Sequence, residues 1–173
     1  MIHMDKKIEE AKMLASRLHA SQTYDHFPYD KHLRDVVDVL IRFGYEGKYL
    51  VAGWLHDILE DCAISYNDLK KKFGYEIAEI VYCLTDELGR NRKERKEKTY
   101  PKLRGNLDAI VVKLADRIAN VEHSLAEGSG TSEMYLKEYQ EFKAALQIED
   151  HALPLWEHLD KLLSNEGVRE PIK

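Results

Sequence analysis

Residues 49–61 read YLVAGWLHDILED, a stretch in which four polar side chains directly follow an apolar run. The apolar run predicts a buried helix, because its residues are hydrophobic on nearly every side of a helical projection. His56, Asp57, Glu60 and Asp61 come next. Charged groups at the end of a core segment need a partner or a metal ion, since burying an unpaired charge is costly.

The spacing within HDILED, residues 56–61, predicts that its polar groups share one side of a helix. Residues four apart lie on the same helical face, so we expect His56 above Glu60 and Asp57 above Asp61. The two pairs would form neighbouring stripes that face one cleft. Solvated charges at a helix end are the simpler interpretation of a lone HD pair, but the apolar run before it favours partial burial.

Apolar positions recur every three or four residues along most of the chain, which predicts helices. A mixed-charge run at residues 86–98, DELGRNRKERKEK, is typical of a solvated helix face, and AEGSGTSE at 126–133 is the clearest loop. There is no internal repeat and no long linker. We therefore expect an all-α helical bundle of roughly eight helices, forming a single domain over residues 1–173. The expected helices are 8–18, 33–41, 50–59, 65–74, 77–84, 107–125, 135–148 and 153–163.

Composition excludes several classes of protein. The chain has 173 residues, of which 44% are hydrophobic and 33% charged, as in an ordinary cytoplasmic globular protein. A net charge of -5 argues against sequence-independent nucleic-acid binding. No apolar run reaches the ~20 residues of a membrane span, and the N-terminus lacks the apolar core of a secretory signal. Cys62 and Cys83 have no CxxC spacing and are expected to be reduced thiols.

Two further segments carry polar groups among apolar residues. KLADRIAN, residues 113–120, contains Lys113, Asp116 and Asn120, and His32 stands in FPYDKHL, residues 27–33. Taken singly, Asp116 could form a salt bridge, Lys113 could lie on the surface, and His32 could be an ordinary histidine. Together, His32, His56, Asp57 and Asp116 form a set of two imidazoles and two carboxylates. Such a set suits Mn²⁺, Fe²⁺, Co²⁺ or Zn²⁺ and favours a catalytic ion with open positions.

The order of these motifs resembles a known family. An H…HD…D pattern in an all-α protein resembles the HD-domain metal-dependent phosphohydrolases. HASQ-x5-PYDKH, LHDILED, TDE and KLADRIAN, in this order over roughly residues 8–125, resemble the hydrolase domain of the RelA/SpoT family, and in particular the stand-alone small alarmone hydrolases. HDxxED combined with KLADRxxN is the specific part of the match. Nothing after Leu163 resembles a synthetase domain, so we expect a hydrolase alone.

The resemblance implies an activity and a set of roles. It implies removal of the 3′-pyrophosphate from (p)ppGpp with Mn²⁺ as cofactor. Asn120 would contact the nucleotide, and we add Lys113 and Tyr24 as substrate-binding candidates. A polyphosphate also needs cations, which the run at 86–98, Lys113 and Arg17 can supply. The resemblance further implies metal ligands at His32, His56, Asp57 and Asp116, and a catalytic pair at Glu60 and Asp61.

The chain departs from the family pattern near the expected base-binding side. Family members usually carry an Arg-Lys pair eight or nine residues before the first metal histidine, where this chain has Thr23 and Tyr24. Leu33 follows that histidine in place of proline, and His123 stands where threonine is often found. None of these departures touches the expected metal ligands. The resemblance therefore supports phosphohydrolysis more strongly than guanine recognition.

Three functions remain open from the sequence. The first is alarmone 3′-pyrophosphohydrolysis. The second is phosphohydrolysis of another nucleotide, such as ppApp, NADPH or a dNTP. The third is a non-catalytic regulatory domain that binds a metal and a nucleotide, although the presence of both Glu60 and Asp61 favours catalysis. We expect a small-molecule nucleotide as partner, no nucleic acid and no membrane, with a homo-oligomer left open.

Overall fold

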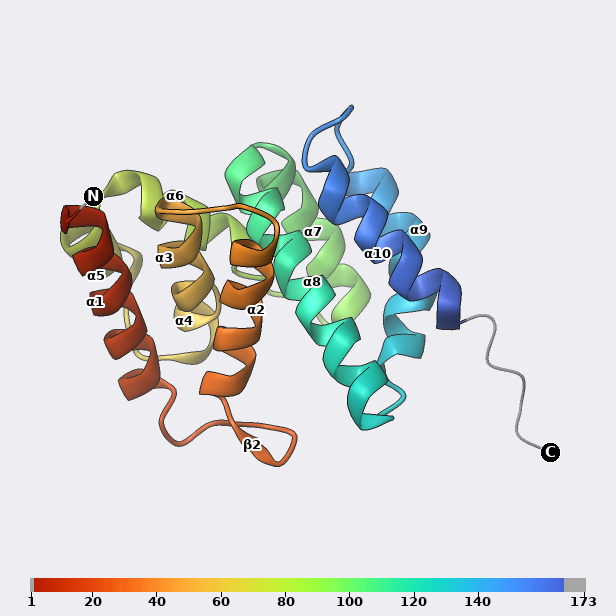
Figure 1. Ribbon diagram of the computed structural model, residues 1–173. Helices are drawn as coiled ribbons and strands as arrows, with labels where there is room; N and C mark the ends of the chain where they lie inside the picture. Colours follow the sequence, from red (N-terminus) through yellow and green to blue (C-terminus); the bar gives the residue numbers. More distant parts are fainter. Residues whose placement is uncertain (1, 167–173) are drawn as a thin grey trace.

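The computed structural model describes residues 2–166, which form ten helices and one short hairpin (Figure 1). The all-α prediction is confirmed. Two helices, α4 and α7, come in addition to the eight expected ones. The elements are α1 (Ile2–Leu18), β1 (Thr23–Tyr24), β2 (Phe27–Pro28), α2 (Asp30–Arg42), α3 (Lys48–Leu55), α4 (Ile58–Asp61), α5 (Tyr66–Phe73), α6 (Tyr75–Leu84), α7 (Arg92–Arg104), α8 (Leu107–Glu127), α9 (Thr131–Leu146) and α10 (Leu153–Glu166).

Helix α2 lies between two hydrophobic clusters. Val36 and Leu40 on α2 pack in a cluster with residues of α8, α9 and α10. Leu33 and Val37 on the same helix pack in a second cluster with residues of α1, α3 and α5. In Figure 1, α2 accordingly stands between α3 on one side and α8 on the other. The first turn of α2 therefore has a fixed position relative to the end of α3 and the middle of α8.

A glycine allows α3 to approach α2 closely. A Cβ atom added to Gly53 would lie 2.9 Å from Leu40 Cδ1 and 3.1 Å from Val37 Cγ2. Contacts this short would force the side chains of Leu40 and Val37, or the helix that carries them, to shift. The absence of a side chain at Gly53 thus sets the spacing of the two helices that carry His32 and His56.

The expected helix over residues 50–59 is interrupted at the HD pair. Helix α3 ends at Leu55, and α4 begins at Ile58. Between them, Asp57 has φ -101° and ψ 0°, which departs from helical geometry. The backbone N–H of Asp61 still donates to the carbonyl oxygen of Asp57 at 3.0 Å. The prediction of one continuous helix was therefore wrong, because a turn at His56–Asp57 redirects the chain.

The ends of several other helices follow the sequence. Ser65 and Asp68 form a reciprocal capping box at the start of α5, as their spacing predicts. Asn91 and Asn106 accept hydrogen bonds from backbone N–H groups in the first turns of α7 and α8. Gly128 ends α8 in the left-handed conformation, with φ +66°. The loop expected over residues 126–133 is shorter than predicted, since only 128–130 lie between α8 and α9.

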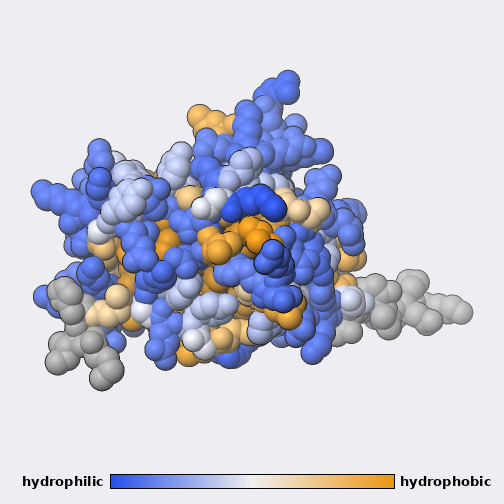
Figure 2. Space-filling model, turned by 90° about the horizontal axis from the view of Figure 1, so that it is seen from above, coloured by the Kyte–Doolittle hydropathy of each residue, from blue (hydrophilic) through white to orange (hydrophobic). Residues whose placement is uncertain are grey.

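The face of the molecule shown in Figure 2 is predominantly polar. Figure 2 shows one face of the molecule, on which hydrophobic side chains lie in small groups between hydrophilic ones. Within residues 2–166, no helix combines the length and the apolar character that a membrane crossing requires.

Candidate metal centre and its pocket

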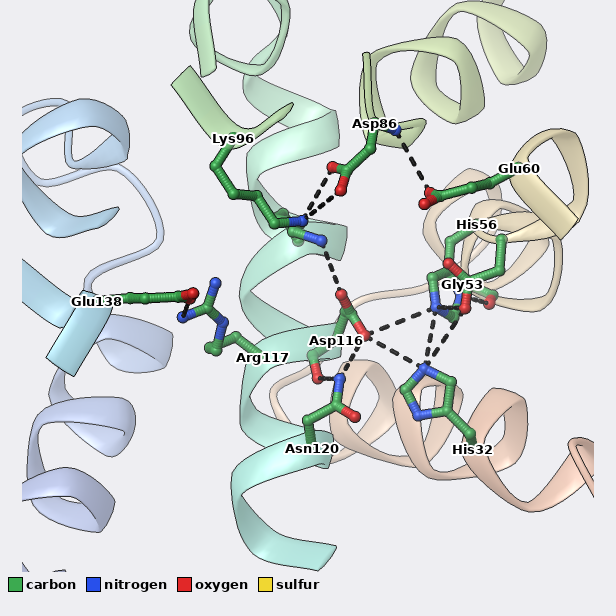
Figure 3. Close-up of polar contacts among 12 residues, drawn as sticks. His32, Gly53, His56, Glu60, Asp86, Lys96, Asp116, Arg117, Asn120 and Glu138 are labelled. Carbon is green, nitrogen blue, oxygen red and sulfur yellow. Dashed lines mark hydrogen bonds and ion pairs between the residues drawn. The ribbon is translucent and has the colours of Figure 1, made fainter. Parts of the chain in front are cut away.

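Four side chains from three parts of the fold converge on one point (Figure 3). His32 Nε2 lies 3.2 Å from His56 Nε2 and 3.2 Å from Asp116 Oδ1. His56 Nε2 lies 3.0 Å from Asp57 Oδ2 and 3.7 Å from Asp116 Oδ1. His32 Nε2 is also 3.6 Å from Asp57 Oδ2. The first turn of α2, the turn after α3 and the middle of α8 thus bring together the four residues that the sequence singled out.

One donor atom from each of His32, His56 and Asp57 lies within 4.8 Å of the other two, as donors to a single divalent cation do. Two atoms that each lie about 2.0–2.2 Å from one ion are roughly 3.0–3.5 Å apart in octahedral or tetrahedral geometry, close to the separations seen here. His32 and His56 are 3% and 2% exposed, so both imidazoles would bind a metal from an environment that holds little water. His56 Nδ1 lies 2.7 Å from the Gly53 carbonyl oxygen, to which it donates when protonated. That bond leaves Nε2 facing the other donors, where a metal ion would replace its proton.

The electrostatic field at this point favours positive charge. Burial alone would lower the pKa of His56, but the carboxylates of Asp57 and Asp116 raise it to about 9. Burial opposes ionisation of Asp116, yet Lys113, His32 and His56 hold the pKa of its carboxyl group well below the usual range. The two carboxylates therefore remain ionised and stabilise cationic charge at the centre, as a metal site requires.

Lys113 and Asn120, which we expected to bind substrate, both contact Asp116 on the same helix. Lys113 Nζ lies 2.9 Å from Asp116 Oδ2. Asn120 Nδ2 donates to Asp116 Oδ1 at 2.8 Å and to the Asp116 carbonyl oxygen at 2.9 Å. Both side chains also line the neighbouring pocket. They therefore orient the Asp116 carboxylate and still reach the space where a substrate would lie.

Two tyrosines surround the ring of His32. The Tyr29 hydroxyl donates to Asp57 Oδ2 at 2.6 Å, and the Tyr24 hydroxyl donates to Asn120 Oδ1 at 2.7 Å. Burial is the main reason why the pKa of each hydroxyl is raised, so both stay protonated and act as donors. Sequence reasoning missed Tyr29, although it stands in PYDKH only three residues before His32.

The structure separates the two acids of the expected catalytic pair. Glu60 lines the pocket, and its Oε2 accepts a long hydrogen bond of 3.4 Å from the backbone N–H of Asp86. Burial and then the nearby carboxylates of Asp86 and Asp57 raise the pKa of Glu60. Asp61 is exposed, does not line this pocket, and accepts from Gln22 Nε2 at 2.9 Å. Glu60 is therefore the better placed of the two to exchange a proton near the centre.

A polar pocket of about 250 Å³ opens beside the four converging side chains. One of its walls is cationic and comes from α7 and α8. Three cations of the run at 86–98 are not part of this wall: Arg90, Lys93 and Lys98 pair with Glu94 or Glu97. Arg17 lines a different depression, next to α5. The cations of the wall are Arg92, Arg95, Lys96, Lys113 and Arg117. The polar run at 86–98 thus turns one face toward the pocket.

Asp86 and Arg117 belong to this pocket, although the sequence did not single them out. Lys96 Nζ lies 2.7 and 2.9 Å from the two carboxylate oxygens of Asp86. Burial, followed by the charge of Lys113, lowers the pKa of Lys96 to about 8. Arg117 is 2% exposed and lies 3.5 Å from Glu138 (Figure 3). The TDE motif, residues 85–87, could have identified Asp86 as a pocket residue. Arg117 stands in KLADRIAN, residues 113–120, where Lys113, Asp116 and Asn120 were the residues singled out.

Two of the departures from the family pattern, Tyr24 and His123, lie together in space. The ring of Tyr24 lies 4.5 Å from that of His123, measured between centroids. His123 Nε2 lies 2.6 Å from Asp25 Oδ2. Thr23 is exposed, and Leu33 is fully buried in the core next to α3. Tyr24 and His123 therefore form one connected aromatic unit at the edge of the centre.

Comparison with known proteins agrees with this arrangement. The family described as HD domain matches residues 11–144. The bifunctional (p)ppGpp synthase/hydrolase SpoT of Escherichia coli K12 is 31% identical over 124 residues, which cover 67% of this chain and 18% of SpoT. A guanosine-3′,5′-bis(diphosphate) 3′-pyrophosphohydrolase of Aquifex aeolicus is 29% identical over 157 residues, covering 87% of this chain and 22% of that protein. The chain thus spans about a fifth of the length of these relatives.

A solved structure shares nearly the whole fold. It is that of a metazoan orthologue of SpoT that hydrolyses ppGpp, with a TM-score of 0.79 and 25% sequence identity. The match covers 94% of this chain and 96% of that one. The helical architecture, the converging His and Asp side chains and the match over residues 11–144 agree with one another. The chain belongs to the HD-domain family.

Proposed function

We propose that this chain is a metal-dependent phosphohydrolase that removes the 3′-pyrophosphate from (p)ppGpp-type alarmones. One observation carries the proposal: two imidazoles and two carboxylates converge beside a pocket with a cationic wall. A metal next to a cluster of Arg and Lys is the arrangement that hydrolysis of a polyphosphate needs. The resemblance to relatives that carry this activity in their names supports the choice of substrate.

His32, His56, Asp57 and Asp116 would hold the ion, for which we propose Mn²⁺. When bound, such an ion lowers the pKa of a coordinated water from ~16 toward ~7 and offsets charge that develops on phosphorus. Two imidazoles with two carboxylates leave coordination positions for water and a phosphate oxygen.

Cys62 and Cys83 are free thiols, which supports our proposal of a reducing, cytoplasmic location.

Glu60 is the residue that would accept a proton from the attacking water. The pKa of Glu60 is raised toward neutral pH, and a general base with such a pKa can both take and return a proton. The water oxygen forms a bond to the phosphorus next to O3′, and the P–O3′ bond breaks. O3′ then takes a proton, so the products are pyrophosphate and a nucleotide with a free 3′-hydroxyl. Asp61 stays a predicted catalytic residue, and its hydrogen bond to Gln22 would let it act only after a side-chain movement.

The cationic wall would hold the phosphates that are not attacked. Arg95 and Lys96 line the pocket from α7, and Lys113 and Arg117 line it from α8. Arg117 is buried and the other three are partly buried, and such cations pair strongly with phosphate oxygens because less water competes for them. Arg92 reaches the same wall while bound to Glu138, so its charge is partly offset. Holding the nucleotide at these groups would orient the 3′-pyrophosphate toward the ion.

Another nucleotide is the second candidate substrate. Thr23 and Tyr24 supply no cation where the family pattern has an Arg-Lys pair, and the Tyr24 hydroxyl is bonded to Asn120. The chemistry at the metal would be unchanged, while the base could differ from guanine.

The test is a panel of nucleotides. Purified protein would be incubated with Mn²⁺ and ppGpp, ppApp, NADPH or each dNTP, and the products separated by ion-exchange chromatography. Release of pyrophosphate from ppGpp is the expected result. Cleavage of another member alone would keep the metal chemistry and change the substrate. Binding of Mn²⁺ without cleavage of any member would favour a regulatory domain.

A further inference from the structure

The hydroxyl of Tyr29 fixes the rotation of one carboxylate of the candidate metal centre. It donates at 2.6 Å to Asp57 Oδ2, the oxygen that also lies 3.0 Å from His56 Nε2. One lone pair of this oxygen accepts the hydroxyl proton, and the other is left to face the centre. The Tyr29 ring is itself held, because it stacks on His19 with a centroid distance of 4.8 Å.

The hydroxyl of Tyr24 acts on the other carboxylate through an amide. It donates to Asn120 Oδ1 at 2.7 Å, so the amide oxygen of Asn120 faces the tyrosine. The amide nitrogen must then face the opposite way, where it donates to Asp116 Oδ1 at 2.8 Å (Figure 3). Asp116 Oδ1 is also the atom that lies 3.2 Å from His32 Nε2. A hydroxyl on Tyr24 therefore selects the amide orientation that holds Asp116.

Both tyrosines also contact the histidine between them. The centroid of the His32 ring lies 4.8 Å from that of Tyr24 and 5.6 Å from that of Tyr29. The two tyrosine rings meet edge to face, 6.3 Å apart. Tyr24 ends β1 and Tyr29 directly precedes α2, so a single short hairpin segment carries both. This segment consequently contacts three of the four side chains that converge, directly or through Asn120.

We propose that Tyr24 and Tyr29 are positioning residues, whose hydroxyls hold the carboxylates of Asp116 and Asp57 in the orientation that binds the metal. This inference rests on the proposed metal centre. Groups that orient metal ligands typically change metal affinity by about 10–100-fold when they are removed. In this chain Tyr24 stands where the family pattern has a cation. Tyr24 would thus serve the metal while it also lines the pocket.

The test measures affinity for Mn²⁺ alone, in the absence of nucleotide. The variants are Tyr24→Phe and Tyr29→Phe, which keep the rings and remove only the hydroxyls. Tyr49→Phe is the matched control, because the Tyr49 hydroxyl donates at 2.7 Å to Asp108, another carboxylate, outside the pocket. Free Mn²⁺ would be followed by its EPR signal, and thermal unfolding of each metal-free variant would show that it is folded.

We expect about 10-fold or greater weakening of Mn²⁺ binding in each of the two site variants and no change in Tyr49→Phe. Because Tyr24 acts through Asn120, the double variant Tyr24→Phe/Asn120→Ala should bind Mn²⁺ no more weakly than Asn120→Ala alone. Parental affinity in both site variants, equal weakening in the control, or fully additive effects of Tyr24 and Asn120 would overturn the proposal. If the parent itself binds no Mn²⁺, the metal centre fails as well, and the two failures are thereby told apart.

Discussion

His32 on α2 and Asp116 on α8 meet across the core, with 3.2 Å between His32 Nε2 and Asp116 Oδ1 (Figure 3). The packing of α2 against both α3 and α8 brings them together. Lys113 and Asn120 then hold Asp116 from its own helix. The contact places the Asp116 carboxylate beside the donors from His32, His56 and Asp57.

Asp116→Asn should abolish high-affinity binding of Mn²⁺. The substitution removes a carboxylate from the donors and leaves the buried ammonium of Lys113 without its ionic partner. We expect Mn²⁺ binding measured by calorimetry to weaken by at least about 100-fold and the metal-free protein to unfold at a lower temperature.

Asp108→Asn is the matched control for Asp116→Asn. Asp108 is also a carboxylate of α8 that pairs with a lysine, since Lys48 Nζ lies 2.7 Å away. It does not line the pocket, so its loss should leave Mn²⁺ binding unchanged. Equal Mn²⁺ affinity of Asp116→Asn and the parent would exclude Asp116 as a ligand.

Glu60→Gln should strongly lower kcat and leave the affinity for Mn²⁺ nearly unchanged. The amide keeps the shape of the side chain but cannot accept a proton, and general-base catalysis contributes about 10²–10⁴-fold to a rate. We expect kcat to fall by that factor while Mn²⁺ affinity changes little.

Asp61→Asn is the comparison for Glu60→Gln, since Asp61 lies outside the pocket lining. We expect a smaller loss of kcat than in Glu60→Gln. A Glu60→Gln variant that hydrolyses the substrate at the parental rate would show that another group takes the proton.

Lys96 should set an upper pH limit on activity. Burial and the charge of Lys113 lower the pKa of Lys96 to about 8, so the ammonium loses its proton as the pH rises through that value. A neutral amine cannot pair with a phosphate oxygen, and kcat/KM should therefore decline above about pH 8. A Lys96→Arg variant keeps its charge, so its kcat/KM should decline only at higher pH. Identical descending limbs for the two proteins would rule out Lys96 as the cause.

Gly53→Ala should destabilise the fold and disturb the centre. The new Cβ would lie 2.9 Å from Leu40 Cδ1, and overpacking of this kind costs about 1–3 kcal/mol in the free energy of unfolding. Denaturant unfolding of the metal-free protein measures this cost. Gly105→Ala is the control, because the nearest atom to its Cβ would be a carbonyl oxygen at 3.4 Å. Equal stability of Gly53→Ala and the parent would mean that Leu40 and Val37 accommodate the added methyl group without net cost.

The sequence predicts the helices well where one face is apolar. Apolar spacing locates α2, and the Ser65–Asp68 pair locates the start of α5. It fails at the HD pair, because Ile58 and Leu59 continue the apolar pattern of α3 through a turn. The apolar pattern reports burial, and the residues that flank the turn, Leu55 and Ile58, are both fully buried. The break depends on local backbone geometry at Asp57, which periodicity does not record.

Residue types and the resemblance suffice to select the four converging side chains, but spacing alone cannot show that His32 and Asp116 meet. That contact depends on how α2, α3 and α8 pack. Lys113 and Asn120 show the same limit, since both line the pocket and also hold Asp116. Tyr29 was missed, because a tyrosine beside a proline gives no sign of a distant carboxylate partner.

The hydrolysis is tested most directly by ³¹P NMR of ppGpp that has been incubated with the metal-free protein, with or without added Mn²⁺, and then freed of the paramagnetic ion by chelation with EDTA. We expect only the sample that was incubated with Mn²⁺ to convert the 3′-diphosphate signals into free pyrophosphate, while the 5′-diphosphate signals persist. Unchanged ppGpp in the presence of protein with bound Mn²⁺, or loss of the 5′-phosphates instead, would contradict it.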